Sequence, residues 1–270
     1  MTSSSVTVGI IGGGGWLGQA FGRAMLESTF AGPRNLILSS RSGLCPGYEA
    51  WPDVRMTSDN RQLAVEADVI ILSVRPEDFD AIAIDAAGKL VISFMAGVRA
   101  DAIARHTRTQ RVVRAMPNAA AEIGRSYTPW FCLAQATGDD RIFAQSLFET
   151  CGEADEMPEE ADIDYMSGLT GSGPAFPALM AEAMIGHAVN RGIPAPVARR
   201  AVKGVIAGAS QLLAREDADA TALIDKFMSY KGTTAAALAA MQENGIAAAI
   251  HAGLDAAETR ALNMSSRGKG

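Results

Sequence analysis

The residues Val6-Thr7-Val8-Gly9-Ile10-Ile11-Gly12-Gly13-Gly14-Gly15-Trp16-Leu17-Gly18 decide the fold of this 270-residue chain. The apolar run 6–11 is typical of a buried strand, and a helical pattern follows from Leu17 to Ser28. A glycine-rich turn between a strand and a helix is the setting of the G-x-G-x-x-G motif that binds dinucleotides. We therefore expect a dinucleotide site at this loop.

The register of the glycine motif is open at this point. The spacing favours Gly13, Gly15 and Gly18, although the additional glycine also permits Gly12 and Gly14. Trp16 and Leu17 belong to the same loop and are expected at the cofactor. An alternative role for Trp16 is that of a hydrophobic plug on the sheet.

The strand–helix pattern continues through the first half of the chain. Short, β-branched runs that predict strands are found at 35–40, 69–74, 90–94 and 112–115, and helical stretches at 60–66 and 76–87. Buried strands that alternate with helices predict a doubly wound parallel sheet. With a sixth strand at 127–134 and a helix at 139–150, residues 1–157 form an expected Rossmann-type α/β domain.

After Met157 the strand signal stops, and the sequence predicts an all-helical domain at 158–270. Breaks fall at Gly192-Ile193-Pro194 and around Tyr230-Lys231-Gly232. The expected helices 174–190 and 195–214 carry few charges, which favours a subunit interface, with packing against the sheet domain as the alternative. A homodimer or higher homo-oligomer built on this helical domain is therefore expected.

Composition argues against several kinds of partner. The formal net charge is −6, whereas a nucleic acid or an anionic membrane needs a basic surface. The three cysteines, Cys45, Cys132 and Cys151, show no metal-binding spacing, so no metal is expected. The start of the chain lacks the basic region of a signal peptide, which indicates a cytoplasmic protein with reduced thiols.

The end of the second expected strand indicates which cofactor is used. The segment Leu38-Ser39-Ser40-Arg41-Ser42 has no carboxylate for a ribose 2′-hydroxyl. Two hydroxyls and a guanidinium, at Ser40, Ser42 and Arg41, suit a 2′-phosphate. NADPH is therefore favoured over NADH, and the alternative is that Arg41 is an ordinary exposed loop residue.

Five further motifs occur in a fixed order. They are Asp68–Pro76, Ser93–Val98, Arg114–Asn118, Leu169–Ala175 and Lys231–Thr234. With these motifs the chain resembles, over nearly its whole length, the pyrroline-5-carboxylate reductases, which catalyse the last step of proline biosynthesis. The resemblance implies an NADPH-dependent reduction of a cyclic imine acid, most simply 1-pyrroline-5-carboxylate.

The resemblance also implies the site residues. The NADPH site would include Asn60, Val74, Arg75, Pro76, Ala96 and Gly97, with Asn118 near both the nicotinamide and the imine. The imine carboxylate would be held by Ser229, Lys231, Gly232, Thr233 and Thr234. The hydroxyls of Thr234 and Ser172 are the expected catalytic groups, because imine reduction needs only a proton for the nitrogen besides the hydride.

The loop at 229–234 is also consistent with anion binding on physical grounds. It precedes the helix-forming run 235–242, and Thr233 or Thr234 can cap that helix while free N–H groups face a carboxylate. Helix capping alone would produce the same sequence.

Three departures separate this chain from the usual family pattern. It has Ala119-Ala120 in place of Thr-Pro, Tyr230-Lys231 in place of Pro-Gly, and Trp16-Leu17 in place of Asn-Met. Tyr230 and Lys231 either change the imine pocket or point to solvent. The alternatives are therefore a reductase of another cyclic imine, such as a piperideine carboxylate, or a non-catalytic NADP(H)-binding protein.

Overall fold

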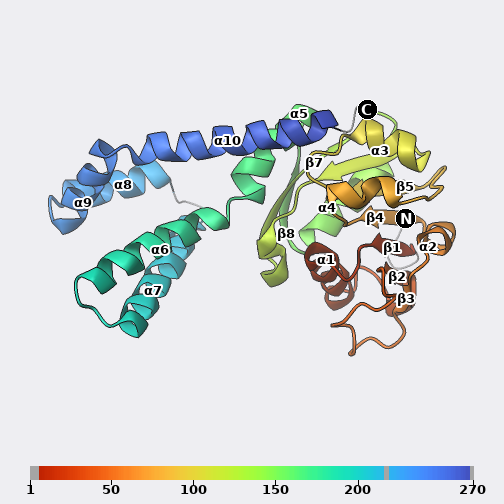
Figure 1. Cartoon of the computed structure of the whole chain (residues 1–270), viewed down its shortest axis with the longest axis horizontal. Coiled ribbons are helices and arrows are strands. Elements are labelled where there is room, and N and C mark those ends of the chain that lie inside the picture. Colours follow the sequence, from red (N-terminus) through yellow and green to blue (C-terminus); the bar gives the residue numbers. More distant parts are fainter. Residues whose placement is uncertain (1–5, 216–218, 268–270) are drawn as a thin grey trace. The chain divides into compact units, whose positions relative to one another are not determined.

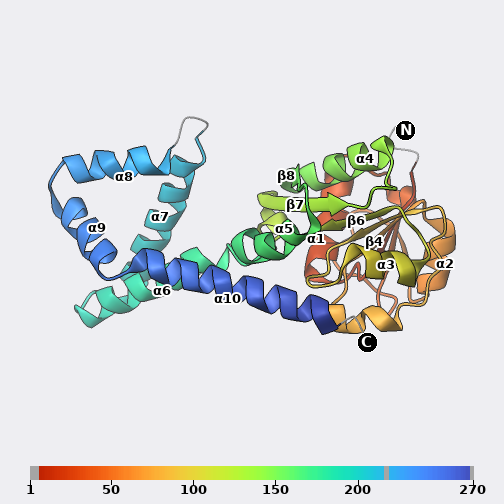
Figure 2. The same ribbon diagram turned by 90° about the horizontal axis from the view of Figure 1, so that it is seen from above.

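The computed structural model describes residues 6–215 and 219–267. The start of the chain, in which no signal peptide was expected, lies outside these ranges. The contacts divide the chain into two compact units, one comprising the residues up to Ser172 and those from Ala256, the other Gly173–Asp255 (Figures 1 and 2). Within the described residues, no helix is both long and apolar enough to cross a membrane.

The first unit is built on one sheet, whose strands run in the order β3-β2-β1-β4-β5-β6-β7-β8. The strands are β1 (Val8–Ile11), β2 (Leu36–Ser39), β3 (Arg55–Thr57), β4 (Val69–Leu72), β5 (Leu90–Ser93), β6 (Val112–Ala115), β7 (Ser126–Cys132) and β8 (Gly152–Glu156). All neighbours from β3 to β6 pair in parallel, and β7 is antiparallel to β6 but parallel to β8.

Helices cover both faces of this sheet. They are α1 (Trp16–Glu27), α2 (Asn60–Glu66), α3 (Ala100–Thr107), α4 (Gly138–Glu149) and α5 (Glu160–Met166). The 3-10 turns η2 (Pro33–Asn35), η3 (Pro76–Ala81) and η4 (Ala119–Ile123) lie in connections, and the π-helical turn η5 (Ser167–Gly171) follows α5.

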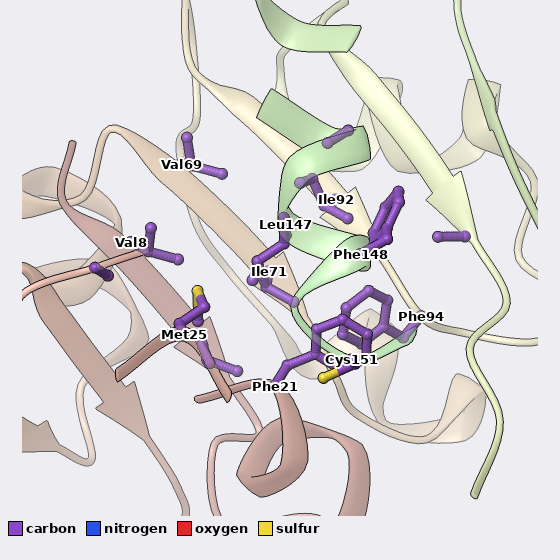
Figure 3. Close-up of a cluster of buried hydrophobic side chains, with 14 of the residues drawn as sticks. Val8, Phe21, Met25, Val69, Ile71, Ile92, Phe94, Leu147, Phe148 and Cys151 are labelled. Atoms are coloured by element: carbon purple, nitrogen blue, oxygen red, sulfur yellow. The ribbon is translucent and has the colours of Figure 1, made fainter. Parts of the chain in front are cut away.

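The core on the α1 and α4 face is rich in aromatic rings. Phe21 of α1 lies 4.7 Å from Phe94 and 6.4 Å from Phe148 of α4, measured between ring centroids. Ile71 and Ile92 of the sheet pack in the same cluster, as Figure 3 shows. The opposite face is covered by α2 and α3, so every central strand is buried on both sides.

A buried charge cluster joins β6 to α5. The Arg114 guanidinium is fully buried and contacts Asp164 at 2.6 Å and Glu160 at 3.3 Å. Glu160 also contacts Arg99 at 2.8 Å and accepts a hydrogen bond from Ala100 N. Two guanidinium groups and two carboxylates therefore balance in charge where the chain leaves the sheet.

The second unit is helical. It holds α6 (Ala175–Asn190), α7 (Ala195–Leu213), α8 (Ala220–Ser229), α9 (Thr233–Glu243) and the first part of α10 (Ile246–Arg267), with α6 packed on α7 and α8 on α9. Among its described residues only Ala198 and Val202 are buried. Large apolar side chains such as Leu179, Val205 and Leu213 are more than half exposed.

The expected fold class is confirmed, and so are the helix breaks near Gly192 and Lys231. Three details were wrong. The expected helix 76–87 is only the turn η3, because helical hydrogen bonding stops at Ala81. The strands β3 and β8 were missed, since their exposed residues lack an apolar run. The strand at 127–134 is antiparallel to its neighbour β6, not parallel.

Candidate active site

The carboxyl ends of three parallel strands meet at one edge of the sheet. Ile11 of β1 is in register with Ser39 of β2 and with Leu72 of β4. The N–H groups of Gly12 and Gly13 both donate to Ser39 O, at 3.0 and 2.9 Å. This is the edge at which open α/β sheets bind their ligands.

The glycine loop allows contacts too close for any side chain. Gly12 has a φ of +88°, and a Cβ there would lie 2.3 Å from Ser73 O. A Cβ on Gly18 would lie 2.4 Å from Gly12 O, whereas one on Gly14 would meet nothing nearer than 3.7 Å. The tight turn therefore depends on Gly12 and the close helix packing on Gly18.

Helix α1 begins with unused donors. Gly15 is its N-cap and provides no side-chain hydrogen bond, and no acidic residue lies in the first turn. The first N–H groups of a helix and its dipole favour an anion. The loop and helix therefore fit the pyrophosphate of a dinucleotide.

A cleft of about 600 Å³ opens at this edge of the sheet. Of the expected cofactor residues, those that line it are Gly15, Ser40, Arg41, Ser42, Asn60, Val74 and Arg75. Gly12 and Gly14 of the alternative register also line it. A cleft of about 520 Å³ along α1 and η4 contains none of the expected site residues. The predicted groups therefore converge on the first of these two clefts.

Asn60 is held in place by the neighbouring strand. Its Oδ1 accepts a 2.5 Å hydrogen bond from Ser39 Oγ, and its backbone begins α2 directly after the N-cap Asp59. This contact leaves the amide nitrogen of Asn60 to face a ligand as a donor.

Arg41 meets a carboxylate that sequence reasoning missed. Its Nη2 donates to Asp78 Oδ2 at 2.9 Å, and Asp78 lines the same cleft from η3. Sequence reasoning looked for an acidic residue at the end of β2, whereas this carboxylate comes from the connection that follows β4. In the sheet one strand, β1, separates β4 from β2, and this arrangement brings the two connections together.

Trp16 is not the hydrophobic plug considered as an alternative. Its side chain is 63% exposed, and its indole N–H donates to Glu122 Oε2 at 3.1 Å. Leu17, the next residue, packs against the aromatic core instead. Trp16 thus joins the glycine loop to η4, which follows Asn118.

Seven expected cofactor residues lie outside the cleft lining, namely Gly13, Trp16, Leu17, Pro76, Ala96, Gly97 and Asn118. Pro76 begins η3, and Ala96 and Gly97 follow β5, where Gly97 has a φ of +69°. Asn118 is nearly buried, donates to Thr170 O at 3.0 Å and accepts from Ala120 N at 2.9 Å. The side chain of Asn118 is therefore engaged in fixing η5 and η4.

The remaining expected residues lie further along the chain. Ser172 is exposed at the end of η5, where its hydroxyl donates to Ser167 O at 3.3 Å. Ser229 ends α8, and Lys231 follows it with a φ of +50°. The sequence expectation that Thr233 or Thr234 caps α9 is wrong, because Gly232 is the N-cap and makes no side-chain hydrogen bond.

The cysteine near the cleft does not have the properties of a reactive thiol. Cys45 lies next to two cleft-lining residues, and burial raises the pKa of its thiol above the ordinary value. A raised pKa disfavours the thiolate, which is the reactive form. Within residues 6–215 and 219–267, no group of three or more His, Cys, Asp or Glu side chains could hold a metal ion.

The glycine loop, the helix N-terminus and the cleft together define a Rossmann-type dinucleotide-binding protein. Residues 7–97 match the model of the NADP oxidoreductase family, coenzyme F420-dependent, and residues 160–264 match that of pyrroline-5-carboxylate reductase dimerisation.

Individual relatives agree with these matches. The chain is 31% identical to a pyrroline-5-carboxylate reductase of Synechocystis, over 97% of this chain and all of the relative. It is 36% identical to one of Thermus thermophilus, over 72% and 74% of the two chains. A solved pyrroline-5-carboxylate reductase of Coxiella burnetii is 25% identical and superposes with a TM-score of 0.88, over 97% and 99%. The chain belongs to the pyrroline-5-carboxylate reductase family.

Alanine substitution in the loop tests the assignment of the close helix packing to Gly18. Gly18→Ala forces a Cβ against Gly12 O, so we expect a loss of about 2 kcal/mol in the free energy of unfolding. Gly14→Ala is the matched control and should change it by less than about 0.5 kcal/mol. Denaturant titration of both variants measures the difference, and equal losses would contradict the assignment.

Proposed function

We propose that this protein is an NADPH-dependent reductase that converts 1-pyrroline-5-carboxylate to L-proline. The observation that carries the proposal is the cleft at the glycine loop, in a chain that matches a member of this family over 97% of its length. Arg41 and Ser40 are the residues proposed to meet the 2′-phosphate, and Asn60, Val74 and Arg75 line the rest of the cleft.

The chemistry asks little of the side chains. Bound NADPH supplies the hydride that reduces the C=N carbon of the imine. The protein has to bind and orient the imine, exclude water and provide a hydrogen-bond partner for the nitrogen. Thr234, with Ser172 as a second hydroxyl, is proposed for that partner.

The loop from Ser229 to Thr234 is proposed to hold the imine carboxylate. Thr233 and Thr234 are the first residues of α9, and no side chain caps this helix at Gly232. Their N–H groups, together with the ammonium of Lys231, would neutralise a carboxylate. Asn118 is proposed to contribute from the cofactor side.

The helical part of the chain is proposed to carry the assembly. We divide the chain into a cofactor domain, 1–157, and a dimerisation and substrate domain, 158–270, in which a homodimer covers exposed apolar residues such as Leu179 and Val205. Free, buried cysteines at positions 45, 132 and 151 are compatible with a reducing compartment, and we propose the cytoplasm.

A second candidate substrate is supported by Lys231. This lysine has left-handed backbone geometry, which favours glycine, and its neighbour Tyr230 is 81% exposed. A larger or differently charged cyclic imine acid, such as a piperideine carboxylate, would use these side chains.

The direct test is NADPH consumption by the purified protein with 1-pyrroline-5-carboxylate, with the piperideine carboxylates alongside. We expect the five-membered imine to give the highest kcat/KM. A higher value for a six-membered imine would favour the second candidate. Binding of NADPH without turnover of any imine would refute the catalytic proposal.

Thr234→Ala tests the proposed hydroxyl. We expect kcat to fall by about tenfold or more, because the imine nitrogen loses its partner, while the Kd of NADPH stays unchanged. Thr221→Ala is a matched control, since Thr221 lies in the first turn of α8. Steady-state kinetics and NADPH titration measure both, and a parallel loss of NADPH binding would remove Thr234 from the substrate side.

Lys231→Gly separates backbone strain from substrate binding. Relief of the left-handed geometry should raise the free energy of unfolding by about 1 kcal/mol, while loss of the ammonium should raise the KM for the imine. Thr29→Gly relieves a similar φ of +58° in the first unit and should change stability alone. An unchanged KM in Lys231→Gly would show that the lysine points to solvent.

A further inference from the structure

The Arg41–Asp78 ion pair occupies the part of the cleft where the 2′-phosphate is expected. Arg41 follows β2 and Asp78 lies on η3, and the two are joined by the 2.9 Å hydrogen bond between Nη2 and Oδ2. Both residues line the same cleft. The guanidinium proposed for the phosphate is therefore already partly engaged by a carboxylate.

A 2′-phosphate and Asp78 place opposite demands on Arg41. The phosphate carries a charge of about −1.5 to −2 near neutral pH and binds a guanidinium best through two parallel hydrogen bonds. Asp78 uses one of those donors and remains as a like charge beside the phosphate. A ribose without the phosphate meets no such conflict, because its 2′-hydroxyl can donate to a carboxylate.

We propose that Asp78 is a specificity-determining residue that competes with the 2′-phosphate for Arg41, and so limits the preference of this cleft for NADPH over NADH. The inference rests on the proposed use of NADPH. In many NAD-binding proteins an acidic residue at the end of the second strand contacts the ribose. Here the corresponding carboxylate would be Asp78, which lies on η3 after β4.

Solvent sets the size of the expected effect. The Arg41 side chain is 89% exposed and that of Asp78 is 38% exposed, so the pair is screened. Exposed ion pairs of this kind change an equilibrium by at most about fivefold. The preference for NADPH should therefore shift by a factor of this order and not disappear.

Binding measurements on Asp78→Asn test the proposal without catalysis. Calorimetric titration of the full chain with NADPH, NADH, 2′,5′-ADP and 5′-AMP gives the four dissociation constants. We expect Asp78→Asn to bind NADPH and 2′,5′-ADP about fivefold more tightly, with NADH and 5′-AMP unchanged or weaker. Asp80→Asn is the control, because Asp80 is exposed on the same turn and does not line the cleft.

A second variant tests whether Asp78 acts through Arg41. In an Arg41→Gln background the substitution Asp78→Asn should no longer tighten 2′,5′-ADP binding. Three results would overturn the inference: equal tightening for NADPH and NADH, equal tightening in Asp80→Asn, or undiminished tightening without Arg41. Failure of the unsubstituted protein to bind NADPH would instead refute the proposed cofactor itself.

Discussion

The placement of α5 and η5, and with it that of Ser172, depends on one buried interaction, the pairing of Arg114 with Asp164 and Glu160. A fully buried guanidinium is tolerated only when carboxylates neutralise it, and removal of one partner from such a group costs about 3 to 5 kcal/mol. This pairing fixes α5 against the end of β6, where the chain continues into Met116, Pro117 and Asn118. Asn118 in turn holds Thr170 of η5. The segment that leads towards Ser172 is thus positioned by electrostatics from within the sheet.

The second constraint is steric and acts at the glycine loop. Parallel pairing in register brings Gly12, Ser40 and Ser73 to one edge, and hydrogen bonds from Gly12 and Gly13 to Ser39 O draw the loop onto β2. Helix α1 can then begin close to the sheet only because Gly18 carries no side chain against Gly12 O. The cleft forms because the paired strands end at one edge and α1 begins close to that edge. Its walls are the residues that follow the ends of these strands. Binding groups from four connections therefore meet although they are far apart in the sequence.

Local patterns predicted the parts of this molecule that depend on local forces. The buried runs from Val8 to Ala115 become strands because each is covered on both faces. The loop from Gly12 to Gly18 is rich in glycine because its close backbone contacts exclude side chains at Gly12 and Gly18. The contact between Arg41 and Asp78 could not be predicted in this way, because it depends on how η3 passes the end of β2. The same holds for Trp16, whose exposed indole donates a hydrogen bond to Glu122, 106 residues away. β3 and β8 pair at the sheet edges through their backbones, so their side chains carry little strand signal.

The two compact units differ in how strongly internal packing restricts their sequences. In the first unit the hydrophobic core, the buried ion pairs and the glycine contacts restrict which residues many positions can hold. In the second, the described residues include only two buried side chains, so its apolar residues require cover from outside their own helices. In its loop at Tyr230 and Lys231, the lysine has a backbone φ of +50°. A glycine would fit that backbone with less strain. The backbone at this loop is therefore strained by the residue that it carries, whereas the contacts of Gly12 and Gly18 at the cofactor cleft leave no room for a side chain.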